Sequence, residues 1–245
     1  MKYIPLLMYH NIDTAISGAL SSLYVTPREF ARQLNSLRAL GFSCLSLAKA
    51  LPFIKENRGK RIIVITFDDG YKDTLENALP ILMRYGFSAT CFVVSSLLGK
   101  TNNWDREITA SRPLMTVEDL YKWRAAGMEV GAHSRSHRNL QTLDDISLRE
   151  EVKGSKSDLE EILQTAITCF AYPYGQYDDR CRNAVILAGY TAAVTASVRR
   201  PQEGYDVFTL PRIGVLNRSS LLLKILASSF VPDPIFRRIF PRLSG

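Results

Sequence analysis

The amino-acid sequence predicts an α/β fold in which parallel strands alternate with helices around a single β/α barrel. Short apolar runs alternate with longer amphipathic segments along most of the chain, a pattern typical of strands joined by crossover helices. The length of 245 residues is common for a one-domain barrel, and no internal repeat or long linker divides the chain. Residues with catalytic chemistry follow several apolar runs, as expected at the carboxyl edge of such a barrel.

The first strand and the first helix have clear local signals. The apolar run over residues 4–9 predicts a buried strand. Thr26 is the predicted N-cap of the helix, with Pro27 in its first turn and Glu29 as the capping-box partner. Apolar side chains then recur at helical spacing until Gly41, which predicts the end of this helix.

The later elements follow the same alternation. The run over 62–67 is rich in β-branched residues, as expected of a strand that is buried on both faces. The predicted elements after it are helix 73–85, strand 89–94, helix 116–126, strand 128–132, helix 144–163, strand 169–172, helix 178–188 and strand 190–195, with 207–210 and 212–215 closing the pattern.

The composition is that of a globular protein rather than of a nucleic-acid-binding or disulfide-rich one. Hydrophobic residues make up 46% of the chain and charged residues 22%. The net charge of +7 is modest, and the basic residues form no stripe outside the C-terminal segment, which argues against nucleic acid as a partner. The four cysteines are far apart in the sequence and are expected to be buried, reduced thiols.

The two ends of the chain bear on localisation. The N-terminus has a single lysine and a short apolar run interrupted by Pro5, which does not match a signal peptide, so we expect a cytoplasmic protein. Residues 218–245 are predicted to form a separate basic, amphipathic segment after a barrel over residues 1–217. This segment either packs on the barrel or, through residues 219–245, binds the surface of the inner membrane.

Three short blocks contain the residues with the most distinctive chemistry. All three histidines lie in two of them: His10 follows the first predicted strand, whereas His133 and His137 follow a later one. In the third block, Asp68 and Asp69 end a strand. Two imidazoles and one carboxylate form the ligand set of a catalytic divalent metal with open positions, and the second carboxylate can then act as a base. The alternative is an Asp N-cap beside solvated loop residues.

The spacing of His133 and His137 supports their binding to one metal ion. At four residues apart on a helical turn, both imidazoles would reach the same side. Ser134 and Ser136 lie between them and could donate or accept the hydrogen bonds that orient histidine ligands.

In these motifs the sequence resembles the polysaccharide deacetylase (NodB-homology) family. The Met8-Tyr9-His10 start of the chain and the departures described below look more like the poly-N-acetylglucosamine deacetylase branch of that family. The matching segments are Thr66-Phe67-Asp68-Asp69-Gly70-Tyr71, His133-Ser134-x-x-His137 and Tyr172-Pro173-Tyr174-Gly175. The resemblance implies a distorted (β/α)7 TIM-like barrel and metal-dependent removal of N-acetyl groups from sugars.

The resemblance also implies roles for individual residues. Asp68 would be the general base, while Asp69, His133 and His137 would hold one divalent metal ion, for which we expect zinc. The backbone N–H of Tyr174, next to Pro173 in the substrate site, would help to bind the oxyanion. These roles suit amide hydrolysis, because a metal polarises the acetamide carbonyl and activates water while a base takes the proton.

Two positions depart from the family pattern. Many members have an arginine beside the base in the third motif, where this chain has Ala171, and many have a late histidine as general acid, whereas no histidine follows His137 here. We hypothesise that Arg212 pairs with Asp68 and that His10 serves as the acid or orients the substrate. The alternatives are a surface cation at Arg212 and a histidine with a structural role at position 10.

The sequence therefore predicts a hydrolase that deacetylates N-acetylhexosamine-containing glycans, either polysaccharides or lipid-linked saccharides. One alternative is a catalytically impaired, carbohydrate-binding barrel, and another is an amidohydrolase for a small non-sugar amide. Trp104, Tyr24 and Tyr177 are either platforms for sugar stacking or surface aromatics.

Overall fold

The structure of this chain is a computed structural model, and it describes residues 4–14, 23–56, 58, 61–105, 111–196 and 206–215. The predicted C-terminal segment 218–245, and with it the predicted membrane contact, lies outside these residues. None of the helices within the described ranges combines the length and the apolar character that a membrane span requires.

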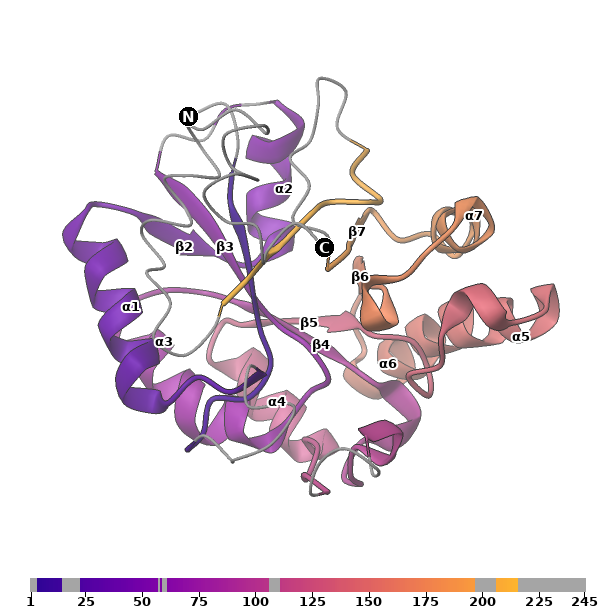
Figure 1. Cartoon of the computed structure of the whole chain (residues 1–245), viewed down its shortest axis with the longest axis horizontal. Coiled ribbons are helices and arrows are strands. Elements are labelled where there is room, and N and C mark those ends of the chain that lie inside the picture. The colour runs from indigo at the N-terminus through magenta and orange to yellow at the C-terminus, as the bar shows by residue number, and fades with distance from the viewer. Residues whose placement is uncertain are drawn as a thin grey trace, which may run out of the picture.

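One curled sheet of parallel strands forms the centre of the molecule (Figure 1). Its strands are β1 (Leu6–Tyr9), β2 (Ser43–Leu45), β3 (Ile62–Phe67), β4 (Thr90–Val93), β5 (Glu129–Ala132), β6 (Cys169–Ala171), β7 (Ala192–Val194) and β8 (Ile213–Gly214). They are hydrogen-bonded in the order β7-β6-β5-β4-β3-β1-β8, and β2 pairs with the first half of β3. The predicted α/β class and the barrel type are confirmed.

The segment over 206–215 joins the two edges of the curled sheet. Leu210 lies beside β7, where its N–H donates to the carbonyl of Ala193 at 3.0 Å. A few residues later, β8 pairs with β1, with Ile213 opposite Leu7. The chain therefore crosses from β7 to β1 at Pro211 and Arg212, and it places Arg212 over the interior of the barrel.

Most of the helices pack on the outer face of the sheet. The α-helices are α1 (Pro27–Ala39), α2 (Leu47–Lys55), α3 (Leu79–Tyr85), α4 (Val117–Ala125), α5 (Asp145–Arg149), α6 (Ser155–Leu163) and α7 (Asp179–Leu187). Shorter helical turns are η2 (Thr74–Ala78), η3 (Ser95–Leu97), η4 (Asn103–Asp105), η5 (Leu140–Thr142), η6 (Glu150–Gly154) and η7 (Pro173–Gly175). Both predicted N-caps form: the Thr26 hydroxyl accepts the N–H of Glu29 at 3.2 Å, and Thr116 and Asp119 make a reciprocal capping box. The predicted capping-box role of Glu29 is not seen, because its carboxylate instead accepts hydrogen bonds from Arg32 and Gln33.

Two parts of the predicted secondary structure need correction. The sequence analysis did not predict β2 and α2, because β2 has only three residues and Pro52 interrupts the helical pattern of α2. The predicted helix over 144–163 is interrupted by η6, a π-helical turn between α5 and α6. Such turns insert one residue into the helix and so rotate the side chains that follow.

The core has two parts, inside and outside the sheet. The larger cluster packs the helices onto the outer face, whereas a smaller one fills the barrel interior and includes Leu6, Val64, Phe92 and Ala171. α2 contributes Leu47, Ala50, Leu51 and Ile54 to the interior cluster. Side chains alternate between the two faces of a strand, so every second one points into the barrel. At the carboxyl end of each strand, this series of inward-pointing side chains continues with polar residues.

Candidate active site

Asp69, His133 and His137 converge at the carboxyl ends of β3 and β5. The Asp69 Oδ1 atom lies 3.4 Å from Nε2 of His133 and 3.3 Å from Nε2 of His137, and all three residues are buried. Their three candidate ligand atoms lie within 4.8 Å of one another. Burial alone would raise the pKa of Asp69, but the two imidazoles outweigh it and hold that pKa well below its usual range.

The orientation of His133 fits a metal ligand. Its Nδ1 atom lies 2.8 Å from the carbonyl oxygen of Ala171, and because a carbonyl can only accept, we assign the ring proton to Nδ1. Nε2 is then the ring atom that faces Asp69. Two imidazole nitrogens and one carboxylate oxygen, each buried, form a donor set that zinc and similar divalent ions accept.

The loop between the two histidines is not the helical turn that the sequence spacing suggested. Residues 133–137 follow β5 without helical structure, and Ser134 and His137 both have a φ of 61°. The Ser134 hydroxyl accepts the backbone N–H of His137 at 2.9 Å. A tight loop, rather than one face of a helix, therefore brings the imidazoles together.

Asp68 and Arg212 form a buried, bidentate ion pair. The guanidinium donates to both carboxylate oxygens at 2.6 Å, and Arg212 is 1% exposed. Its Nε also donates to the carbonyl of Thr195 at 2.9 Å, and its Nη1 to the hydroxyl of Thr66 at 3.0 Å. The contact predicted between these side chains is thus present, and the alternative of a surface cation at Arg212 is wrong.

The surroundings of Asp68 keep it ionised. Burial would raise the pKa of its carboxyl, but Arg212, followed by the nearby His133, outweighs this effect and lowers the pKa below the ordinary value. At Ala171, where the sequence resemblance led us to expect an arginine, the backbone carbonyl instead orients His133. Arg212 reaches the carboxylate of Asp68 from the segment that crosses from β7 to β1.

Aromatic rings surround His137. Trp104 stacks on its imidazole with ring centroids 4.2 Å apart, and Tyr174 meets it edge-on at 4.7 Å. Tyr174 has a φ of 58° and is 50% exposed, whereas Pro173 is buried. Two of the aromatic residues predicted to stack on a sugar are less suitable for that role: Tyr24 is buried below Arg112, and Tyr177 stacks on Tyr172.

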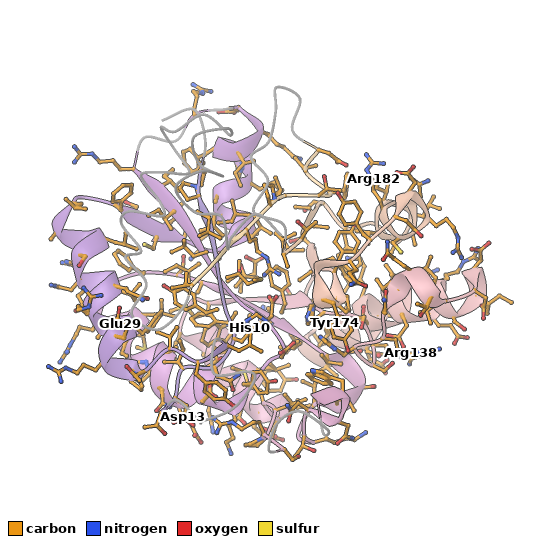
Figure 2. All side chains as sticks on the ribbon, in the orientation of Figure 1. His10, Asp13, Glu29, Arg138, Tyr174 and Arg182 are labelled. Carbon is orange, nitrogen blue, oxygen red and sulfur yellow. The ribbon has the colours of Figure 1, made fainter. Side chains whose placement is uncertain are left out.

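His10 lies at the end of β1, near the centre of the molecule (Figure 2). It is half-buried. Tyr9 pairs with Phe67, and the N–H of Asp68 donates to the carbonyl of Tyr9 at 3.0 Å, so His10 and Asp68 leave neighbouring strands at the same edge of the sheet. The structure therefore brings His10 to the edge at which the other predicted site residues lie.

The sequence analysis missed the residues that fix the loop after His10. Asp73 accepts the backbone N–H of Ile12 at 3.0 Å, and Asn77 donates to the carbonyl of Ile12 at 2.8 Å. Arg112 forms ion pairs with Asp13 and Asp73. Burial, with a smaller contribution from Asp13, raises the pKa of Asp73 to about 6 although Arg112 opposes this. The sequence feature that could have identified Asp73 was its closeness to Asp68 and Asp69 along the chain.

Comparison with known proteins agrees with this geometry. A family model described as polysaccharide deacetylase matches residues 55–193. YxkH of Bacillus subtilis, named for the same family, is 26% identical over 214 residues, which cover 86% of this chain and 71% of the relative. The poly-beta-1,6-N-acetyl-D-glucosamine N-deacetylase of Staphylococcus epidermidis is 25% identical over 82% of this chain and 71% of its own length. The deacetylase PplD of Streptococcus pyogenes, solved with acetate, superposes with a TM-score of 0.79 and 26% identity over 92% of this chain and 97% of that chain.

Proposed function

The chain belongs to the polysaccharide deacetylase family, and we propose that it removes N-acetyl groups from N-acetylhexosamine-containing glycans with the help of one divalent metal ion. One observation carries the proposal. Beside the three converging ligand residues lies a fourth buried group, the ionised carboxylate of Asp68, which is held by Arg212 rather than by the ligand cluster. A ligand set with an adjacent, separate base is what amide hydrolysis needs.

Asp69, His133 and His137 would hold the metal, and zinc suits their mixture of nitrogen and oxygen donors. A bound divalent cation would supply the Lewis acidity that polarises the acetamide carbonyl and makes water a better nucleophile. The chain itself supplies ligand orientation, because the Ala171 carbonyl fixes one imidazole ring and Ser134 fixes the backbone of the other ligand.

Asp68 would act as the base that takes the proton from the attacking water. Its low pKa keeps it ionised at neutral pH, and the two hydrogen bonds from Arg212 fix both carboxylate oxygens. Arg212 would thus position the base and keep it ionised until it accepts the proton. Burial of this pair favours catalysis over simple sugar binding, because desolvating two charges gives no evident benefit to a binding module.

Tyr174 and His10 would complete the reaction. The backbone N–H of Tyr174, whose ring contacts the His137 imidazole, would donate to the oxyanion that develops on the acetamide oxygen. His10 would protonate the departing amine or orient the sugar, a role supported by its place after β1, beside the strand end that contains Asp68. Full activity in His10→Ala would contradict this role.

The proposed substrate is a β-linked N-acetylglucosamine polymer or a lipid-linked saccharide of the same sugar. The name of the Staphylococcus epidermidis relative supports the polymer, and the aromatic rings of Trp104 and Tyr174 beside the ligand cluster suit a sugar ring better than a small amide. Contact with the inner-membrane surface through residues 219–245 remains part of this proposal.

The experiment is a mass-spectrometric screen of zinc-loaded protein against β-1,6-linked and β-1,4-linked N-acetylglucosamine oligomers. We expect the loss of acetyl groups from the β-1,6-linked series, with free acetate released in equal amount. Asp68→Asn is the control and should leave the oligomers intact. Intact oligomers in every wild-type reaction, or turnover of small amides alone, would contradict the proposed function.

A further inference from the structure

The loop that contains both histidine ligands is bound on its outer side by one face of the η6–α6 helix. The carboxylate of Glu151 accepts the backbone N–H groups of Arg135 and Ser136, each at 2.9 Å, through its Oε2 atom. Its Oε1 atom accepts the hydroxyl of Ser136. One side chain therefore binds three donors from the two residues at the centre of the loop.

Burial makes these contacts significant. Glu151 is 7% exposed, and a buried carboxylate is strongly unfavourable unless hydrogen bonds replace its lost hydration. Ser134 and His137, on either side of the bound residues, both adopt a left-handed φ of 61°. Residues other than glycine rarely adopt this backbone conformation, so the loop needs contacts that hold it in place.

The same helical face binds the side chain of Arg135. Asp158 accepts the guanidinium through both oxygens, at 2.9 and 3.0 Å, and also accepts the hydroxyl of Ser95 at 2.7 Å. Gly154 leaves space for this side chain, since a Cβ atom at that position would lie 3.1 Å from Cδ of Arg135. Glu151 and Gly154 in η6 and Asp158 in α6 thus all lie against this loop.

We propose that Glu151 is a positioning residue for the metal site. By fixing the backbone at Arg135 and Ser136, it holds His133 and His137 in the arrangement in which their Nε2 atoms both face Asp69. The inference rests on the proposed metal-dependent function. A rival explanation is that Glu151 only attaches the helix to the loop, in which case its loss would reduce stability and leave metal affinity unchanged.

The test compares Glu151→Gln with Glu150→Gln in the full chain. Glu150 is the preceding residue on the same helical turn, and it is exposed, so its substitution removes the same charge without breaking a contact to the loop. For each folded, chelator-stripped protein, the zinc dissociation constant is measured by competition with a chromophoric chelator. The urea midpoint of the metal-free protein is measured in parallel.

We expect Glu151→Gln to bind zinc roughly 10-fold or more weakly, the size typical of residues that orient metal ligands, and Glu150→Gln to match the wild type. Ser136→Ala, which removes only the hydroxyl contact, should give an intermediate affinity. A Glu151→Gln protein with wild-type zinc affinity but a lower urea midpoint would overturn the proposal.

If Glu151→Gln does not fold, Ser136→Ala decides, and wild-type affinity in that variant overturns the proposal. Zinc binding by the wild type distinguishes this failure from a failure of the proposed function. If the wild type itself binds no zinc, the metal-dependent function is contradicted and the inference falls with it.

Discussion

At the scale of single residues, the reaction depends on two neighbouring aspartates in different electrostatic environments. Asp69 faces two imidazoles, whereas Asp68 faces a guanidinium, although the two residues are consecutive. The sequence identified both carboxylates and the pairing of Asp68 with Arg212. It gave no signal for Thr66 or for the Thr195 carbonyl, which fix Arg212 in place, because such contacts depend on three-dimensional proximity.

The Arg212–Asp68 pair should show strong coupling in a double-mutant cycle. Arg212→Met leaves a buried carboxylate without its partner, and we expect it to lower the free energy of unfolding by about 3–5 kcal/mol. Asp68→Asn combined with Arg212→Met buries no uncompensated charge and should recover most of this loss, without recovering activity. Urea denaturation checks the stabilities. A double variant no more stable than Arg212→Met would contradict the account.

The two aspartates should separate catalysis from metal binding. Asp68→Asn removes the base, and we expect kcat to fall by about 10²–10⁴-fold while the zinc dissociation constant stays near its wild-type value. Asp69→Asn removes a ligand charge and should weaken zinc binding directly. Acetate-release kinetics and chelator competition give the two readouts. Equal effects of both substitutions on zinc affinity would show that the roles are assigned incorrectly.

At the scale of elements, local signals predicted those with a strong period or a clear cap. Thr26 and Thr116 cap the helices as expected, and the β-branched run over 62–67 forms β3. The loop over 133–137 was predicted as a helical turn, because a spacing of four residues does not distinguish a helix from a tight loop with left-handed residues. The interior position of α2 likewise depends on the closed barrel around it.

Gly175 is the last residue of the Tyr172-Pro173-Tyr174-Gly175 motif, and its replacement should be much more harmful than that of a comparable glycine. Its φ is 66°, and a Cβ atom there would lie 2.3 Å from Cβ and 2.4 Å from the backbone nitrogen of Ala196. Gly86 has the same φ but open space around it. We expect Gly86→Ala to lower the free energy of unfolding by about 1 kcal/mol and Gly175→Ala by about 2–4 kcal/mol. Equal losses in denaturant titrations would contradict the predicted clash.

At the scale of the whole molecule, barrel closure creates the site. Arg212 and Asp68 are 144 residues apart in sequence and meet because one segment crosses from β7 to β1. The rule that parallel strands end at one edge predicted which blocks would gather, including His10, Asp68 and His133. It could not predict which partner each side chain would contact, because that depends on how far the sheet curls.

Asp73 links the loop after β1 to the helix after β3, and it should make stability depend on pH. Its pKa of about 6 lies above the ordinary value of 3.8, so its protonated form stabilises the fold at low pH and this contribution is lost as the pH rises through 6. Relative to Asp73→Asn, the wild type should lose about 2–3 kcal/mol of unfolding free energy between pH 4 and pH 7. Urea denaturation of metal-free protein at each pH measures this difference. A flat difference would contradict the raised pKa.

The central claim is that Asp69, His133 and His137 hold one cation on which deacetylation depends. Acetate release from a β-1,6-linked N-acetylglucosamine oligomer, followed while zinc is titrated into chelator-stripped protein, tests it most directly. We predict no release without metal, a rise that saturates at one zinc ion per chain, and no rise in His137→Ala. Undiminished release from the stripped protein, or a wild-type titration curve in His137→Ala, would contradict the claim.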